Sequence, residues 1–387
     1  MSEYKICQRG LWDSTIPGIE FDENGVSNYA KMFDKYVEQY PRGQKGKDDW
    51  DKYLSEIKLA GKNKKYDCII GVSGGTDSSY LMHLAIKQGL RPLAVTLDNG
   101  WSSDVSVQNI KNVTNALKID LETYVIDYEE IKDIQKSYIK AGLPWIDFPT
   151  DQAIKSVLYR IANRENIKYI LIGHDFRSEG SQPNEWTYGD SKQIKYIQKK
   201  FGTKKLKTFP NISIFENAYL GYVKGIKMIY PFFYLDYKKS EAQKLLIEKY
   251  NWKYYGGHHH ENAFTKFAIA YWMPQKFGMD KRIITFSAQI LSGDLTREKA
   301  LKLIKESPYD LKQMENDKLF TIKKLDMTPE EFSIYWNSEN KSFHDYPSYS
   351  NLIEKLYWVT KPLIKLFVHH LPAHFIQLEV RKKKINS

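Results

Sequence analysis

Short apolar runs alternate with amphipathic segments through the first half of the chain. Apolar, β-rich runs predict strands at 67–72, 92–97, 121–126 and 169–172. Helical periodicity between these runs predicts a helix from about Asp77, a second helix with Ile110, Val113 and Leu117 on one face, and a third with Thr150 as its N-cap. Strands that alternate with helices are typical of a parallel sheet with crossover helices.

The predicted fold class is therefore α/β, with a doubly wound parallel sheet and an α-rich C-terminal region. Such sheets bind ligands beyond the carboxyl ends of their strands, which here lie near Ser73, Asp98, Asp127 and His174. We predict three regions: a polar and aromatic region at 1–65, the α/β domain at 66–235, and a mostly helical region at 236–387. Within the α/β domain, residues 176–235 break the rhythm and are predicted to form an insertion or lid over the site.

Composition narrows the class of protein. The longest apolar runs are far shorter than the roughly 20 residues that cross a bilayer, and the N-terminus lacks an apolar signal core. The only cysteines are Cys7 and Cys68, and the second lies inside a predicted buried strand. We expect a cytoplasmic protein without disulfides or membrane spans.

The chain is basic, with 58 Lys and Arg against 47 Asp and Glu and a formal charge of +11. This balance favours anionic partners but does not choose between nucleic acid, a nucleotide-sugar and others. The basic run at 381–384 is typical of a solvated tail.

The stretch Gly71-Val72-Ser73-Gly74-Gly75-Thr76-Asp77-Ser78 joins the first predicted strand to the first helix. Its glycines allow a tight turn whose N–H groups converge on an anion, and the helix N-terminus adds a favourable dipole. A Walker loop would supply a lysine after its last glycine, whereas this loop has Asp77, which we interpret as a magnesium contact. The sequence therefore predicts a phosphate site at this turn.

This string resembles the PP-loop ATP pyrophosphatases, which cleave ATP between the α and β phosphates and adenylate a carbonyl oxygen. The resemblance implies that ATP and Mg²⁺ bind here, with the nucleotide held by Ser73, Gly74, Gly75, Thr76, Asp77 and Ser78. It also places Leu97 and Asp98 near the adenine and ribose, although Asp98 suits equally the N-terminal turn of a helix. Gly173 and His174 end the fourth strand at the same edge, where His174 is a functional candidate or an ordinary loop residue.

Further segments resemble the N-acetyl sugar amidotransferases of bacterial surface-glycan synthesis, of the WbpG and PseA type. They are 21–26, 149–151, 207–210, 255–261, 265–267, 276–282 and 292–298. The resemblance implies that an acetamido sugar, nucleotide-linked or lipid-linked, becomes an acetamidino sugar with ammonia from a separate glutaminase. Lipopolysaccharide O-antigen synthesis is one setting in which such sugars are made.

A transition state that loses pyrophosphate needs cations, for which Lys266, Lys281 and Arg282 are the candidates, unless they are surface charges. His259 or Glu261 could remove a proton from the attacking nitrogen. The run His258-His259-His260 could also be a metal patch, although three adjacent residues rarely face one ion.

Many members of the family that this chain resembles look as if they carry an N-terminal zinc knuckle with two Cys-x-x-Cys pairs. In this chain the zinc knuckle is degenerate. The matching positions hold Cys7, Gly10, Ser27 and Ala30, so that one thiol of four remains and no structural zinc is expected.

Three other functions agree with parts of the sequence. A tRNA-modifying PP-loop enzyme suits the charge, but a thiolating version usually needs paired cysteines, and nucleic acid does not explain the segments above. A synthetase that makes its own ammonia lacks a nucleophile, since position 2 is Ser2. A non-catalytic nucleotide-binding partner subunit is opposed by the intact loop at 73–78.

Overall fold

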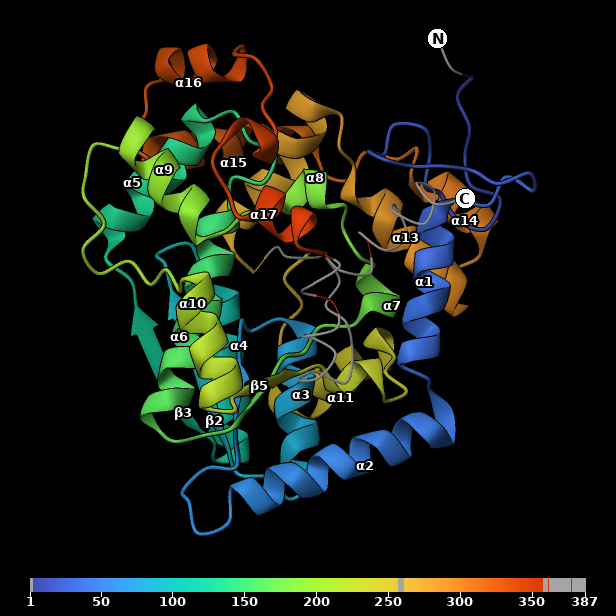
Figure 1. The fold of residues 1–387 in the computed structure, drawn as a ribbon, viewed down its shortest axis with the longest axis vertical. Coiled ribbons are helices and arrows are strands. Elements are labelled where there is room, and N and C mark those ends of the chain that lie inside the picture. Colours follow the sequence, from blue (N-terminus) through green and yellow to red (C-terminus); the bar gives the residue numbers. More distant parts are fainter. Residues whose placement is uncertain (1–2, 257–260, 358–360, 362–376, 378–387) are drawn as a thin grey trace.

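The α/β domain is built on a five-stranded parallel sheet with strand order β3-β2-β1-β4-β5. Its strands β3, β2 and β5 are labelled in the lower left of Figure 1. The computed structural model describes residues 3–256 and 261–357, with Lys361 and Gln377. The strands are β1 (Cys68–Gly71), β2 (Pro92–Asp98), β3 (Asp120–Val125), β4 (Tyr169–Leu171) and β5 (Lys227–Ile229). The predicted α/β fold with a doubly wound parallel sheet is confirmed.

Helices cover both faces of this sheet, as a parallel sheet requires. On one face, α3 (Thr76–Lys87) packs against β1 and β2; on the other, α6 (Phe148–Arg164) packs against β1, β2 and β4. The helix α4 (Asp104–Leu117) packs against α3, and α5 (Tyr128–Lys140) packs against α6. Ile69 and Ile170 point to the face that is covered by Val157 and Leu158 of α6. Their neighbours in β1 and β4 point to the opposite face, where Leu81 of α3 joins the larger core. The period-2 alternation of the strands thus sorts the apolar side chains into two layers.

One boundary prediction is wrong. Thr150 was expected to be the N-cap of α6, but this helix begins at Phe148 and its N-cap is Asp147. Pro149 lies in the first turn, where its missing N–H costs nothing and its fixed φ suits a helix. The helix therefore begins three residues earlier than an N-cap at Thr150 would place it.

Residues 176–235 contribute a strand that the sequence pattern did not predict. β5 has only three residues and pairs with β4, so it extends the sheet at one edge. Around it lie α7 (Phe176–Glu179), α8 (Asn184–Thr187), α9 (Ser191–Phe201), α10 (Ile214–Ala218), a π-helical turn at Tyr219–Val223 and a 3₁₀ turn at Pro231–Phe233. A three-residue strand is too short to show alternation, which explains why periodicity missed it.

The N-terminal region folds into α1 (Asn28–Gln39) and α2 (Gly43–Ala60). The indole of Trp50 in α2 donates a hydrogen bond to Gln88 at the end of α3. Near the start of the chain, Cys7 is fully buried and its sulfur accepts a hydrogen bond of 3.3 Å from the Ser27 N–H. Ala30 is fully buried beside them, so the positions of the degenerate zinc knuckle are joined by packing and hydrogen bonds.

The region after residue 236 is mostly helical in the part that the structure describes. Its elements are α11 (Lys239–Tyr250), α12 (Ala263–Phe267), a π-helix at Ala268–Lys276, α13 (Lys281–Ser292), α14 (Arg297–Leu303), α15 (Leu311–Lys324), α16 (Pro329–Trp336), a 3₁₀ turn at Phe343–Asp345 and α17 (Ser350–Lys355). None of the helices in the described residues is long and apolar enough to cross a membrane.

Candidate functional site

The loop between β1 and α3 makes a turn that only glycine can complete. Gly74 has φ +78, and a Cβ at this position would lie 2.2 Å from the backbone oxygen of Ser106 in α4. The positive φ and the close approach of α4 both exclude a side chain. The turn therefore brings the following N–H groups to the start of a helix of 12 residues, where an anion is favoured.

The N–H groups of this loop have only long contacts. The N–H of Gly75 donates to the hydroxyl of Ser73 at 3.3 Å, and the N–H of Thr76 donates to the hydroxyl of Tyr255 at 3.4 Å. Ser78 accepts a hydrogen bond of 3.2 Å from the N–H of Ser73. Hydrogen bonds of this length are weak, so a phosphate oxygen could replace them at little cost.

The end of β4 closes against the same helix. A Cβ on Gly173 would lie 2.7 Å from the backbone carbon of Asp77, so that a glycine is needed for this approach. β1 and β4 are neighbours in the sheet, while the chain leaves β1 towards β2 on its other side. This is the switch point at which sheets of this kind bind ligands.

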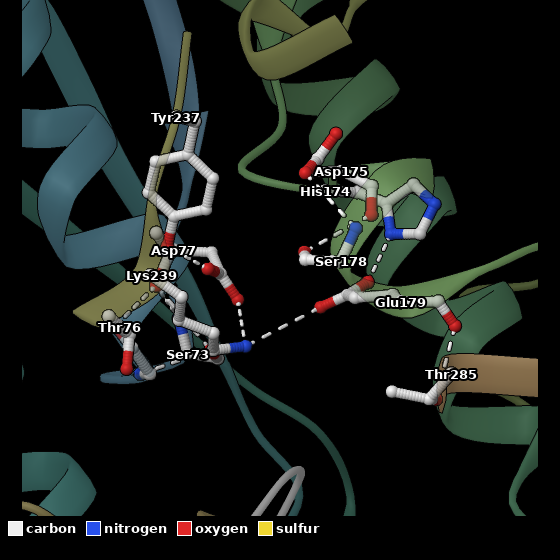
Figure 2. A network of polar contacts seen from close by, with 12 residues as sticks. Ser73, Thr76, Asp77, His174, Asp175, Ser178, Glu179, Tyr237, Lys239 and Thr285 are labelled. Atoms are coloured by element: carbon white, nitrogen blue, oxygen red, sulfur yellow. Dashed lines mark hydrogen bonds and ion pairs between the residues drawn. The ribbon is translucent and has the colours of Figure 1, made fainter. Parts of the chain in front are cut away.

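Asp77 lies at the centre of a polar network that three separate elements contribute (Figure 2). Its carboxylate accepts a hydrogen bond of 2.8 Å from Nζ of Lys239 at the start of α11, and a second from the hydroxyl of Tyr237. Nζ of Lys239 also lies 3.9 Å from the carboxylate of Glu179, which in turn contacts His174. The network thus holds a lysine between two carboxylates beside the loop.

Burial and charge oppose each other in this network. Burial alone would lower the pKa of Lys239, but the charges of Asp77 and Glu179 outweigh it, so that the pKa of this ammonium is raised. Burial likewise opposes protonation of His174, and Glu179 raises its pKa. Lys239 is therefore a permanent cation next to the anion-binding turn.

A cavity of about 540 Å³ connects these residues with a second polar group. We call Ser73, Gly75, Asp77, Ser78 and Lys239 the loop group. The apolar wall beside it is formed by Val95, Leu97, Ile154, Leu158 and Ile172. The second group, which we call the Lys281 group, consists of Trp145, Asp147, Asp151 and Lys281.

The Lys281 group is built around the indole of Trp145. Its N–H donates to Asp151 at 2.7 Å, and Nζ of Lys281 lies 4.3 Å from the centre of its ring. Burial raises the pKa of Asp147 to about 7, and its carboxylate accepts a hydrogen bond of 2.5 Å from Thr265. Burial also lowers the pKa of Lys281 to about 8.

Most of the predicted site residues meet at this cavity. Its walls include Ser73, Gly75, Asp77, Ser78, Leu97, Gly173, His174, Glu261 and Lys281. Gly74 and Thr76 lie just behind the wall: Gly74 shapes the turn, and the Thr76 hydroxyl accepts a hydrogen bond from Gln243. His259 lies outside the described residues.

Three predicted residues point elsewhere. Asp98 is exposed, and its carboxylate accepts a hydrogen bond from the Gly100 N–H. Lys266 forms an ion pair of 2.5 Å with Asp317. Arg282 forms an ion pair of 2.8 Å with Asp280 and donates to backbone carbonyls near the end of α14. These last contacts are typical of a residue that holds the fold together.

Lys239 is the main residue that sequence reasoning missed. It follows Asp77 by 162 positions and stands at the start of an ordinary helix, without a motif around it. Its neighbour Tyr237, which also contacts Asp77, carries no signal either. Only the packing of α11 against α3 brings them to the loop.

Comparison with known families gives one match, in the C-terminal part of the chain. Residues 261–360 match the family described as LPS biosynthesis protein WbpG-like, C-terminal domain. This part of the chain is similar to that domain, and we call residues 261–360 the WbpG-like domain. The resemblance noted in the sequence is confirmed at this level, and the WbpG-like domain supplies Glu261, Thr265 and Lys281 to the cavity.

Other similarities are more distant. The tRNA-specific 2-thiouridylase MnmA of Vesicomyosocius okutanii is 33% identical over 106 residues, which cover 24% of this chain and 29% of that protein. The chain thus matches less than a third of the length of this curated relative.

Solved structures with some likeness include NMN synthetase from Francisella tularensis, with 15% identity, a TM-score of 0.37, and coverage of 77% of this chain and 96% of that one. The NH3-dependent NAD synthetase from Campylobacter jejuni has 15% identity, a TM-score of 0.32, and coverage of 78% and 97%. Likeness at these TM-scores carries no argument about function.

Proposed function

We propose that this protein is an ATP-dependent amidotransferase that converts the acetamido group of a sugar into an acetamidino group. The observation that carries the proposal is one shared cavity, which both the anion-binding turn and the WbpG-like domain line. Because residues 261–360 resemble a family of lipopolysaccharide biosynthesis proteins, we expect this part of the chain to contact a sugar acceptor. Neither group alone would suggest this reaction.

The loop group fits the phosphates of ATP. The turn at Gly74 presents the N–H groups of Gly75 and Thr76, which have only long contacts, and Lys239 adds a partly buried positive charge. The apolar wall with Leu97 and Ile172 suits an adenine ring. Magnesium, when bound with the triphosphate, would supply further positive charge, and Asp77 is the residue that we expect to contact it.

The first step is attack of the amide oxygen on the α-phosphorus, which forms an O–P bond and expels pyrophosphate. Negative charge grows on the phosphate oxygens in this step, so fixed donors and cations lower its barrier. Lys239 and the turn are positioned for this role. Because Lys239 is already paired with Asp77 and Glu179, its ammonium is held in place before the nucleotide arrives.

In the second step, ammonia attacks the activated carbon and AMP leaves with the electron pair of the C–O bond. We expect the ammonia to come from a separate glutaminase, since both described cysteines are buried and neither suits a nucleophile. Burial raises the pKa of Cys68 strongly, which keeps its thiol protonated and unreactive.

The test is to measure AMP and pyrophosphate with acetamido sugars, free and as nucleoside diphosphate conjugates. With a suitable acetamido sugar, both products should form when ammonium is the only nitrogen source, without glutamine and without a partner protein. Glutamine by itself should not support synthesis. A rate of ATP cleavage that does not change when any of the acetamido sugars is added would count against the proposal.

Thiolation of tRNA is the second candidate, because MnmA shows 33% identity over its matching segment. The buried cysteines oppose it, since sulfur transfer needs a reactive thiolate. Binding of tRNA with a steep salt dependence would favour this alternative.

A further inference from the structure

Two lysines line the cavity, and they differ in their surroundings. Nζ of Lys239 has a carboxylate at 2.8 Å. Nζ of Lys281 lies over the ring of Trp145, and among the described residues nothing accepts a hydrogen bond from it or pairs with it at ion-pair distance. The cavity wall thus carries a lysine that the binding of a nucleotide at the loop does not use.

We propose that Lys281 is the general base of the amination step: its uncharged amine takes the proton from the nitrogen that attacks the activated acceptor. This inference rests on the proposed function and assigns a role that the sequence left open between His259 and Glu261. It also changes the role of Lys281 itself, which the sequence offered as a cation for the leaving phosphates.

The environment of Lys281 has opposing effects on its proton: the face of the Trp145 ring favours the charged ammonium, whereas burial favours the uncharged amine. Burial in the cavity lowers its pKa to about 8, and this effect exceeds the opposite influence of the three carboxylates that face it, Asp151, Glu179 and Asp147. A base with a pKa near the working pH has a useful unprotonated fraction and still holds a proton well. Lys239, by contrast, stays charged.

The proton balance of the step is simple. The lone pair of ammonia forms the new C–N bond, and the nitrogen of the adduct then carries one proton too many. Lys281 accepts this proton on Nζ, while the C–O bond to AMP breaks and its electrons leave with AMP. The ammonium form of Lys281 then returns its proton to solvent through the cavity.

The location of the other candidate favours Lys281. Glu261 lies against the loop, where one of its carboxylate oxygens is 3.4 Å from the place of a Cβ on Gly75. A carboxylate at that place faces the phosphates rather than the acceptor. Lys281 belongs to the opposite group, with Asp147 and Trp145.

Two substitutions separate a base from a simple cation. Lys281→Arg keeps a positive charge but removes the base, because a guanidinium stays protonated, and Lys281→Met removes both. We expect amidine formation from ammonium to fall about 100-fold in both variants, within the usual range for a lost general base. Lys200→Met is the matched control, since Lys200 also lies over an aromatic ring but outside the cavity.

Adenylation can be measured without amination, and this separates the role of Lys281 as a base from the proposed function as a whole. Exchange of labelled pyrophosphate into ATP, with acetamido sugar and without ammonia, reports on adenylation and should change by less than about threefold in either variant. If Lys281→Arg forms amidine at nearly the wild-type rate, Lys281 is not the base. If the wild type shows no exchange with any acetamido sugar, the proposed function fails instead.

A second measurement needs no acceptor. Brief labelling of the native protein with acetic anhydride over a range of pH, read by peptide mass spectrometry, gives the titration of single lysines. Lys281 should become reactive near pH 8, below the pH at which a lysine of a model peptide titrates. Titration of Lys281 together with the exposed lysines would overturn the inference.

Discussion

The α/β domain at 66–235, here called the sheet unit, and the WbpG-like domain contribute to one cavity in different ways. The sheet unit supplies the loop group mainly from one continuous stretch, 73–78, at the carboxyl end of β1. The WbpG-like domain supplies single residues from separate helices, such as Thr265 of α12 and Lys281 of α13. A backbone turn that binds phosphate must be local, whereas an acceptor site can be assembled from distant parts of the chain.

The loop group and the Lys281 group also differ in charge, although residues of the α/β domain contribute to both. At the loop, Lys239 and Asp77 are paired at 2.8 Å, which fixes a cation for a substrate of high negative charge. Around Trp145, Asp147 has a pKa raised to about 7 and Lys281 a pKa lowered to about 8. Groups that titrate near neutral pH are suited to moving protons. We therefore assign charge stabilisation to the loop group and proton transfer to the Lys281 group.

The largest effect is expected from Gly74→Ala. The added methyl group would lie 2.2 Å from the backbone oxygen of Ser106, at a φ of +78, so that the turn must open and its N–H groups lose their direction. ATP binding should become undetectable by calorimetry, while circular dichroism still shows a folded protein. Gly225→Ala is a control for the positive φ alone, since a Cβ there meets nothing within 4 Å. Unchanged ATP binding in Gly74→Ala would contradict the role of the turn.

Asp77→Asn should follow, with a loss of about 100-fold in adenylation, which corresponds to about 2.7 kcal/mol of transition-state stabilisation. The substitution keeps the shape but removes the charge that holds Lys239 and that we expect magnesium to contact. Pyrophosphate release at saturating ATP and magnesium is the measurement. A variant as fast as the parent would show that the loop assignment is wrong.

Substitution of Lys266 should have little effect on the chemistry. Lys266 is paired with Asp317 outside the cavity, so Lys266→Met should lower the melting temperature but leave the adenylation rate within about threefold of the parent. If Lys266→Met is still folded but loses most of its adenylation activity, the distinction between Lys266 and the lysines that line the cavity would be wrong.

The smallest effect concerns the degenerate zinc knuckle. We expect no stoichiometric zinc by elemental analysis, and Cys7→Ser should cost only modest stability, because the thiol accepts one hydrogen bond from Ser27. One zinc per chain that is lost in Cys7→Ser would show that other groups replace the missing ligands.

Much of the sheet and of the loop could be predicted from the sequence. Strands such as Pro92–Asp98 are apolar runs of ordinary length, and the turn at 73–78 is a local motif. Local patterns could not reveal β5, which has three residues, or Lys239, which meets Asp77 only because α11 packs on α3. Nor could they show that Arg282 is occupied by Asp280 and by backbone carbonyls. Such partners depend on how helices pack, which a single sequence does not state.

The most direct test of the account is incorporation of ¹⁵N from ammonium into an acetamido sugar. The protein, ATP, magnesium, labelled ammonium and a panel of acetamido sugars, free and nucleotide-linked, are incubated without glutamine, and products are read by mass spectrometry. The account predicts an amidine that carries one labelled nitrogen, formed together with one AMP. An amidine formed from glutamine by this chain alone, or AMP formed with no change in any sugar, would contradict it.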